Sequence, residues 1–215
     1  GYMATMTGAE IEVSNDRYFR TSELLCCLTD TPRTNLNYYY PKISRPYRYV
    51  RFTPPPPAYP TADCRAEIAE LAFFDSVDSE EHLPSKAIYG GGPVDENPAH
   101  DIDKACDDDW LTFYYSSGPR DSIVLDLQRA STIKKILFVP RNDDNFITPG
   151  NVYELFYQSG VKGWISLGVQ TATTNELVYR NIPEGALLWL RNLTRGKEEQ
   201  VFYVEDGEQK FVGYE

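Results

Sequence analysis

The sequence contains little histidine, no long apolar run and fewer basic than acidic residues. Only two of its 215 residues are histidine, and it has no Gly-x-Ser-x-Gly or His-Glu-x-x-His motif. Nucleophilic or zinc-dependent hydrolysis therefore has little support, because both need bases or metal ligands of this kind. No apolar run approaches the roughly 18 residues of a membrane span. The net charge of −11 argues against nucleic acid and anionic membranes as partners.

Cysteine is also scarce, and its spacing matches no zinc-binding pattern. The four cysteines are Cys26, Cys27, Cys64 and Cys106. On a strand, the adjacent Cys26 and Cys27 would point to opposite faces. A catalytic thiol is disfavoured because the chain has just two histidines to serve as its base. We predict buried free thiols, and at least one disulfide is the alternative.

Tyrosine and proline are abundant instead, with sixteen and fifteen residues. They fit short strands joined by rigid loops better than a helical bundle. Three runs rich in Ile, Leu, Val, Phe and Tyr, at residues 133–140, 152–157 and 164–167, are bounded by turn residues. Such runs are typical of strands, and no competing helical period is present. We therefore predict an all-β protein whose middle belongs to an antiparallel β-sandwich.

The first third of the chain shows further strand patterns. Residues 23–29 and 47–52 are strand candidates, and the second alternates strictly between two faces. Residues 67–75 have a composition that would also suit a helix. Their alternation, and their place in the repeat described next, favour a strand.

Residues 8–75 resemble residues 150–204 in the same order, with loops of different length. The matched segments are 8–13 with 150–155, 47–51 with 187–191 and 70–74 with 199–203. Residues 85–148 have no counterpart in the first copy. We predict a partial copy at 1–78 and a complete unit at 79–215, divided within an acidic, turn-rich segment. The partial copy would close on itself or pack against the complete unit; if the repeat is coincidental, it is a separate small β module.

Several segments together resemble a known family. They are KACDDDWLTF at 104–113, SIVLDL at 122–127, IKKILFV at 133–139 and YELFY at 153–157 before Gly163 and Trp164. In this order they resemble discoidin domains, which are galactose-binding-domain-like jelly-roll β-sandwiches. The sequence departs from the family at Asp108 and Gln128, where glycine is usual. The resemblance implies an antiparallel jelly-roll β-sandwich preceded by a partial second copy.

The segments PRNDDNFITPG (140–150) and LRNLTRGKEE (190–199) are similar in sequence to discoidin-like modules in secreted or surface multidomain proteins of gut Bacteroidetes. That similarity implies an extracytoplasmic location, in the periplasm, at the cell surface or secreted. It also implies that other domains of a parent polypeptide are partners and that a carbohydrate is the ligand.

A structural calcium ion is the first candidate ligand. Calcium prefers six to eight oxygen ligands on a tight loop, and the turn at 103–112 offers Asp103, Asp107, Asp109 and Thr112. The family resemblance implies that Glu199, on a late strand, closes the site. The alternative is an acidic, solvated turn without metal.

A sugar site is the second candidate. Carbohydrate sites combine fixed polar groups with an apolar platform. The polar half is predicted at Arg141, Asn142, Asp143, Asp144 and Asn145, beside Phe146, with the ring supplied by Tyr114, Tyr115 or Trp110. The alternative is a structural turn closed by an internal Arg–Asp pair.

The charged segment 191–199 is predicted to be a solvated connection, with the rim of a binding face as its alternative. Trp164 and Trp189 are predicted to lie in the core. We therefore expect a non-catalytic module that binds carbohydrate or anchors a larger enzyme to its substrate. The second hypothesis is a structural spacer or protein-interaction module without a glycan site.

Overall fold

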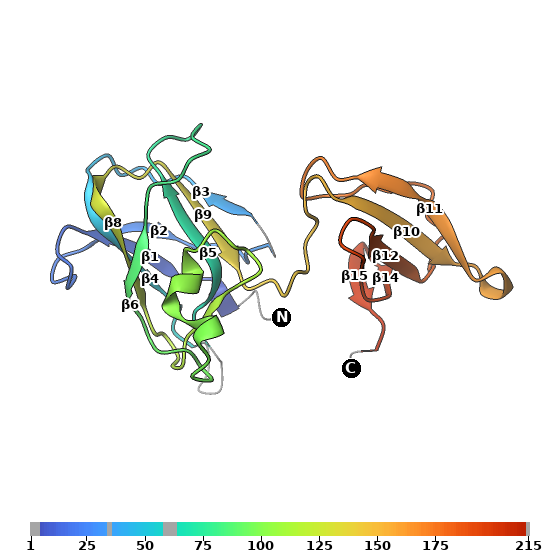
Figure 1. Cartoon of the computed structure of the whole chain (residues 1–215), viewed down its shortest axis with the longest axis horizontal. Helices are drawn as coiled ribbons and strands as arrows, with labels where there is room; N and C mark the ends of the chain where they lie inside the picture. The colour runs from blue at the N-terminus through green and yellow to red at the C-terminus, as the bar shows by residue number, and fades with distance from the viewer. Residues whose placement is uncertain (1–4, 34–35, 58–63, 214–215) are drawn as a thin grey trace. The chain divides into compact units, whose positions relative to one another are not determined.

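The computed structural model describes residues 5–33, 36–57 and 64–213. It is mostly β, with three antiparallel sheets, as the strand patterns predicted. The chain divides into two compact units, residues 1–145 (unit 1) and 146–215 (unit 2), and Figure 1 labels most of their strands. Each unit is described by itself.

Unit 1 contains two sheets (Figure 1). The first has the order β2-β1-β4-β8-β6, from β2 (Glu23–Cys27), β1 (Glu10–Ser14), β4 (Tyr47–Thr53), β8 (Ile123–Ser131) and β6 (Lys86–Tyr89). The second has the order β3-β9-β5-β7, from β3 (Asn37–Tyr39), β9 (Lys135–Pro140), β5 (Glu67–Phe74) and β7 (Tyr114–Tyr115). Two 3₁₀ turns, η2 (Pro98–His100) and η3 (Ile102–Ala105), lie between β6 and β7.

The two sheets of unit 1 share one apolar core. Ile11 and Val13 of β1 are fully buried, whereas Glu12 between them is partly exposed, because successive side chains of a strand point to opposite faces. Phe52 of β4 stacks on Phe138 of β9 with ring centres 5.5 Å apart, which joins the first sheet to the second. Every residue of β5 is buried, as expected for a central strand covered on both faces.

The boundary predicted after residue 78 lies within unit 1, in the connection between β5 and β6. Strands from both sides of it pair: β4 with β8, and β5 with β9. The acidic connection is itself anchored, since the Leu83 N–H donates to the Phe73 carbonyl at 2.6 Å and Leu83 is buried. Its turn-rich composition marks a surface loop between two strands of one core.

The four cysteines are free thiols. Cys64 is buried, and Cys26, Cys27 and Cys106 are partly buried. Burial raises the pKa of Cys26 and of Cys106 to about 11, so these thiols stay protonated at neutral pH.

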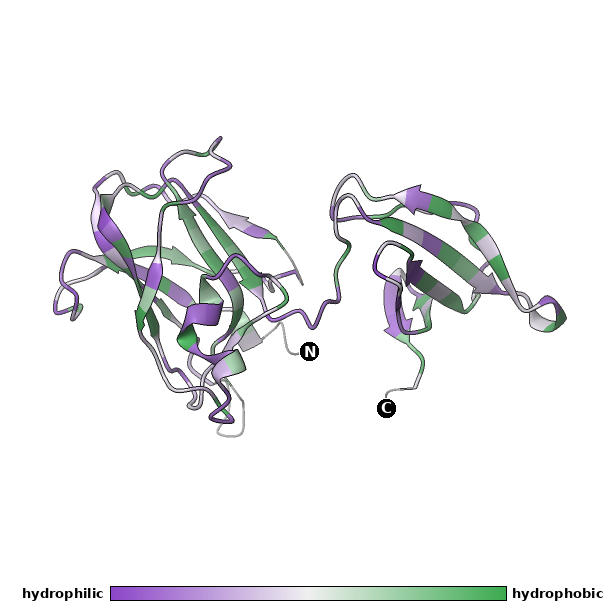
Figure 2. Ribbon diagram, viewed as in Figure 1, coloured by the Kyte–Doolittle hydropathy of each residue, from purple (hydrophilic) through white to green (hydrophobic). Residues whose placement is uncertain are grey.

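Unit 2 contains one sheet, of order β11-β10-β12-β14-β15 with β13 on β12. Its elements are β10 (Val152–Gln158), η4 (Gly160–Lys162), β11 (Trp164–Thr171), β12 (Leu188–Asn192), β13 (Lys197–Glu198), β14 (Phe202–Glu205) and β15 (Glu208–Phe211). The strands predicted at 152–157 and 164–167 are confirmed as β10 and β11. Figure 2 shows apolar and polar residues alternating along these strands.

The described part of unit 2 has a small apolar core. Its buried apolar side chains are Tyr153, Leu155, Ala172 and Leu188. The clusters of buried apolar residues found in the described chain all lie in unit 1. Large apolar side chains such as Val169 and Phe211 are about half exposed instead. A single sheet leaves one of its faces without a second layer, which accounts for this exposure.

Three strands of unit 2 repeat an arrangement found in unit 1. In each unit the middle strand, β1 or β10, lies between two antiparallel neighbours. The cross-strand pair Glu12 and Arg51 in unit 1 occupies the same register as Glu154 and Arg191 in unit 2. These are the residue pairs that the sequence repeat places in equivalent positions.

The entry into the middle strand is repeated as well. Gly8 (φ +93°) donates its N–H to Leu28 at 2.7 Å, and Gly150 (φ +89°) donates to Ala172 at 2.8 Å. Both glycines adopt a left-handed conformation that residues with a side chain rarely take. The two units therefore share the register of the middle strand with one neighbour, β1 with β4 and β10 with β12, and the turn that starts the middle strand.

Candidate functional site

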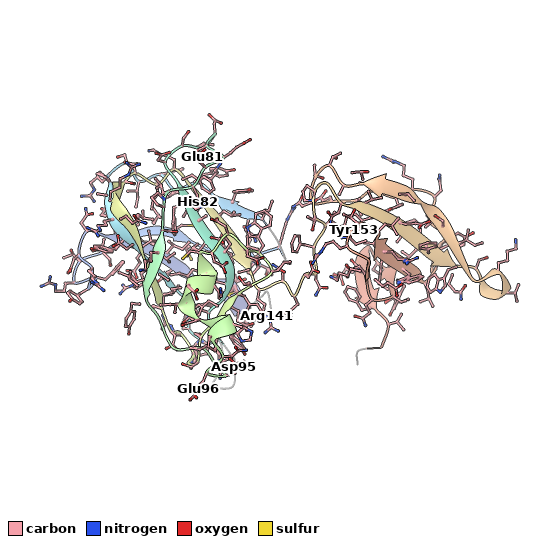
Figure 3. All side chains as sticks on the ribbon, viewed as in Figure 1. Glu81, His82, Asp95, Glu96, Arg141 and Tyr153 are labelled. Atoms are coloured by element: carbon pink, nitrogen blue, oxygen red, sulfur yellow. The ribbon has the colours of Figure 1, made fainter. Side chains whose placement is uncertain are left out.

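The Arg141 loop follows β9 in unit 1 and is closed by its own hydrogen bonds. The Arg141 guanidinium donates from Nε to Asp143 Oδ1 at 2.8 Å and from Nη1 to Glu67 Oε2 at 3.1 Å. Its Cζ atom lies 4.5 Å from the centre of the Phe113 ring and 5.8 Å from that of Tyr115. Arg141 is labelled in Figure 3. Two carboxylates and two rings thus hold the guanidinium.

Asn142 of this loop also forms hydrogen bonds to other residues of unit 1. Asn142 is only 4% exposed, and its Nδ2 donates to the Trp110 carbonyl at 2.8 Å. Its Oδ1 accepts the Asp144 N–H at 2.9 Å, and its carbonyl accepts the Asn145 N–H at 2.8 Å. Asp143 and Asp144 both have positive φ, of 48° and 62°. The structural turn with an internal Arg–Asp pair, the alternative given above, describes this geometry.

Only some of the aromatic residues predicted to lie beside this loop do so. Tyr115 lies beside Arg141, whereas Tyr114 is fully buried and donates its hydroxyl to the Gly91 carbonyl at 3.1 Å. Phe146 is the first residue of unit 2. Phe113, which the sequence arguments did not single out, is the ring that stacks closest to Arg141. Its position next to the Tyr114–Tyr115 strand was the available signal.

We expect Arg141→Ala to lower the free energy of unfolding of unit 1 by about 2 kcal/mol. Glu67 is 7% exposed and would lose this cationic partner. Denaturant titration measures the effect. Arg20→Ala, which breaks an exposed pair with Asp16, is the control and should leave the midpoint unchanged. Equal effects of the two substitutions would contradict a structural role for the Arg141 pair.

Four of the predicted calcium ligands belong to unit 1, and the fifth belongs to unit 2. The Thr112 hydroxyl bonds to both carboxylate oxygens of Asp107, at 3.0 and 2.9 Å. Lys104 Nζ donates to Asp107 at 3.2 Å and lies 3.6 Å from Asp103. Glu199 belongs to unit 2, where Lys197 lies 3.1 Å from it. Within the described residues no group of three or more His, Cys, Asp or Glu is arranged to hold a metal ion.

Glu70 is the carboxylate that the structure places beside the acidic turn. It is 2% exposed on β5 and accepts the Asp108 N–H at 2.9 Å. Asp108 has φ +62° and pairs with His82 at 2.9 Å. Burial raises the pKa of Glu70 to about 7, although the Asp108 N–H lowers it. The sequence repeat aligns Glu70 with Glu199, which was the signal for this position.

As placed, these residues do not converge on a common centre for calcium. Asp107 is engaged by Thr112 and Lys104, so a cation bound there would have to displace the lysine ammonium. Calcium remains a prediction from the sequence, and within unit 1 the buried Glu70 carboxylate is bonded to the same acidic turn.

Unit 2 carries a wide-open surface cavity of about 700 Å³. It is lined by two indole rings and a polar segment, from Trp164, Trp189, Glu198, Glu199, Gln200 and Val201. The ring centres of the two tryptophans are 5.6 Å apart and the planes are inclined by 53°. Trp164 is 36% exposed. This exposure differs from the predicted core position, because the described part of unit 2 has no second sheet to cover that face.

Strand pairing explains why the two indoles meet. Phe156 of β10 is opposite Trp189 of β12, and Gln158 of β10 is opposite Trp164 of β11. Opposed side chains share a face of the sheet, and residues two apart on one strand also share it. Both tryptophans therefore lie on the face of Phe156, whose ring centre is 5.6 Å from that of Trp189.

The polar side of the cavity carries two acidic residues, each of which pairs with a cation. Glu198 and Glu199 line the cavity. Arg191 lies 3.6 Å from Glu198, with its Cζ 5.3 Å from the Trp189 ring centre, and Lys197 lies 3.1 Å from Glu199. Trp189 and Arg191 are two residues apart on β12 and share a face of the sheet, so acidic and basic groups both border the cavity. The predicted alternative for segment 191–199, the rim of a binding face, suits this geometry.

The helical segments in the described chain are short turns, none of them long and apolar enough to span a membrane. Comparisons of the chain with protein-family models, with curated proteins and with solved structures find no match.

Proposed function

We propose that the chain is a non-catalytic module that binds carbohydrate through unit 2 and anchors a larger extracytoplasmic protein to glycan. The observation that carries this proposal is the cavity in which Trp164 and Trp189 stand beside Glu198 and Glu199. It combines apolar rings with a few polar groups, as small-molecule sites do.

The chemistry of sugars matches these surfaces. One face of a pyranose exposes C–H bonds that pack against an indole, while its hydroxyls donate to carboxylate and amide oxygens. The aromatic ring supplies apolar contact area, and the carboxylates supply orientation. Gln200 is held in place because its Nε2 donates to the Val212 carbonyl at 2.9 Å. The segment that lines the cavity is thus bonded to the residue that follows β15.

The surroundings of the two histidines support a non-catalytic role. His82 pairs with Asp108 at 2.9 Å, and His100 with Asp95 at 3.2 Å. His100 also stacks on Phe113, with ring centres 4.6 Å apart. These contacts occupy both imidazoles with structural partners.

A discoidin-type jelly-roll with an internal duplication is the finer fold that we propose. The register of β1 with β4 equals that of β10 with β12, and this match together with the equivalent glycine turns supports a common origin for residues 8–53 and 150–192. In unit 1 the segment 86–140 pairs with the copy that precedes it. The family resemblance implies instead that segment 86–140 forms a sandwich with residues 150–204, which follow it.

The structural spacer is the second candidate, and the Arg141 loop favours it. That loop, where a sugar site was predicted, has its guanidinium and its Asn142 amide engaged by other residues of unit 1. A spacer needs such closed loops and no ligand. The two candidates differ in what they expect of the unit 2 cavity.

We expect Trp164→Ala to lower the affinity for glycan at least tenfold, because the exposed ring supplies stacking area that alanine lacks. A glycan array of neutral oligosaccharides identifies a binder, and isothermal titration measures the change. Val161→Ala, at a fully exposed position of unit 2, is the control and should bind as the unmodified chain does. Silence of the unmodified chain across the array would favour the spacer.

A further inference from the structure

We infer that Arg191 is the hydrogen-bonding anchor of the carbohydrate site in unit 2, and that it binds an adjacent pair of sugar hydroxyls with help from Glu154 and Glu198. This inference rests on the proposed carbohydrate binding and specifies the chemical group of the sugar that the site recognises. It follows from a comparison of equivalent positions in unit 1 and unit 2.

The comparison starts from a pair of residues that the two units hold in the same register. In unit 1 Glu12 lies opposite Arg51, and in unit 2 Glu154 lies opposite Arg191. The Arg51 guanidinium donates to Glu12 Oε2 from Nε at 2.9 Å and from Nη2 at 2.6 Å. Two hydrogen bonds therefore join the pair in unit 1.

The equivalent pair in unit 2 is not joined. In the described part of unit 2 the carboxylate that pairs with Arg191 is Glu198, and their closest atoms, Nη2 and Oε1, are 3.6 Å apart, longer than a hydrogen bond. Glu198 lies opposite Arg191 on β13, as Glu154 does on β10. The guanidinium thus stands between two carboxylates on one face of three neighbouring strands. Because the Arg191 side chain is 39% exposed, its N–H groups are accessible to a ligand.

This face is the outer side of the sheet in both units. In unit 1 Ile11 and Val13, on either side of Glu12 in β1, are fully buried, so Glu12 lies on the opposite face from the core. In unit 2 the equivalent residues of β10, Tyr153 and Leu155, are buried in the same way. Core packing therefore does not explain why the arginine of unit 2 is left without a hydrogen-bonded carboxylate.

Trp189 restrains the Arg191 guanidinium beside the cavity. The two residues are two apart on β12, and the Arg191 Cζ lies 5.3 Å from the centre of the Trp189 ring. Trp189 and Glu198 both line the cavity. Contact with an aromatic ring limits the motion of a guanidinium without supplying a hydrogen-bond acceptor to it. Arg191 is thus positioned in advance, with donors to spare, at the border of the cavity.

The three charged groups match the chemistry of a vicinal diol. A guanidinium presents its N–H groups as a rigid fork that binds two neighbouring oxygen atoms. Two adjacent hydroxyls of a sugar ring supply such oxygens, and their own protons can be donated to Glu154 and Glu198, which only accept. A diol both accepts and donates, so it satisfies the arginine and the two carboxylates together.

The test compares variants of the full chain on the array of neutral oligosaccharides, followed by isothermal titration of the tightest binder. We expect Arg191→Ala to weaken binding at least tenfold, because charge-assisted hydrogen bonds are lost. Arg191→Lys should weaken it at least threefold, since an ammonium cannot form the fork. Arg51→Ala, at the equivalent position of unit 1, is the matched control and should bind as the unmodified chain does.

Two further measurements distinguish binding from a structural role. Monodeoxy analogues of the titrated sugar should identify a hydroxyl whose loss weakens the unmodified chain and leaves Arg191→Ala unaffected, because its partner is already missing. Hydrogen–deuterium exchange of β10 and β12 should be the same with and without Arg191→Ala, since an exposed ion pair contributes little to stability. Reduced protection of these strands, or losses that add for every analogue, would overturn the inference.

The outcomes separate this inference from the proposed function. If Arg191→Ala binds as tightly as the unmodified chain while Trp164→Ala does not, the inference fails and carbohydrate binding stands. Equal losses in Arg191→Ala and Arg51→Ala also overturn it, because the effect would then not arise at the cavity. If the unmodified chain is silent across the array, the proposed function itself fails.

Discussion

Phe138→Ala is expected to lower the free energy of unfolding of unit 1 by about 4 kcal/mol. Phe138 is fully buried and stacks on Phe52 at 5.5 Å with an interplanar angle of 14°, so its removal leaves a cavity between the two sheets. Close-packed interiors recover only part of such a loss by relaxation. Hydrogen–deuterium exchange measures the effect strand by strand, and so separates unit 1 from unit 2.

The distribution of the effect matters as much as its size. Because Phe52 precedes residue 78 and Phe138 follows it, protection should fall together in β1, β4, β5, β8 and β9. Tyr18→Ala, at a position 77% exposed, is the control and should change the stability of unit 1 by less than about 0.5 kcal/mol. Loss of protection confined to β8 and β9 would contradict a single core that joins the two halves.

The strands themselves could be predicted from the sequence. Alternating side chains were sufficient for β4 and β10, and the repeat resolved the ambiguity of β5, whose composition also suits a helix. Alternation identifies a strand because the side-chain period of two is a local property. It carries no information about which distant strand becomes the neighbour.

The division into units could not be predicted for that reason. Segment 86–140 lies in the sequence between residues 8–75 and residues 150–204, which resemble each other. In the structure it pairs with the earlier copy. Loop composition favoured the opposite choice, because an acidic turn looks the same between two domains as between two strands of one sheet.

Whether the tryptophans of the candidate site are exposed also depends on which strands pack against their sheet. Trp164 and Trp189 have the pattern of core residues, and a covering layer on their face would have made them so. Whether a side chain is core or surface depends on what lies opposite its face of the sheet, which a local pattern does not specify. By contrast, the internal closure of the Arg141 loop was foreseeable, since Arg141 and Asp143 are close in sequence and opposite in charge.

Unit 1 is expected to lose stability as the pH rises from 5 to 8 because of Glu70. Burial raises the pKa of this carboxyl from 4.5 to about 7, so the folded state holds a proton that the unfolded state releases. The contribution of this proton to the free energy of unfolding is fully present below the unfolded-state pKa, near 4.5, and is lost as the pH rises through about 7. A shift of this size corresponds to roughly 3 kcal/mol. Desolvation lowers the pKa of His82, but its hydrogen bonds to Leu83 and Asp108 raise it by more. Loss of the His82 proton with rising pH therefore also lowers the stability of unit 1.

Glu70→Gln should remove most of this pH dependence and make unit 1 more stable than the unmodified chain at pH 8. The amide is neutral at both pH values and can still accept the Asp108 N–H, which the Glu70 carboxyl now accepts at 2.9 Å. Thermal unfolding in the presence of chelator measures the effect, and Asp78→Asn, at an exposed acid of the same unit, is the control.

A second experiment, without chelator, tests the predicted calcium ion. If the ion binds beside Glu70, calcium added at pH 8 should stabilise the unmodified chain and not Glu70→Gln, because a cation favours the charged carboxylate. A flat stability profile of the unmodified chain between pH 5 and 8 in chelator would contradict a protonated, buried Glu70.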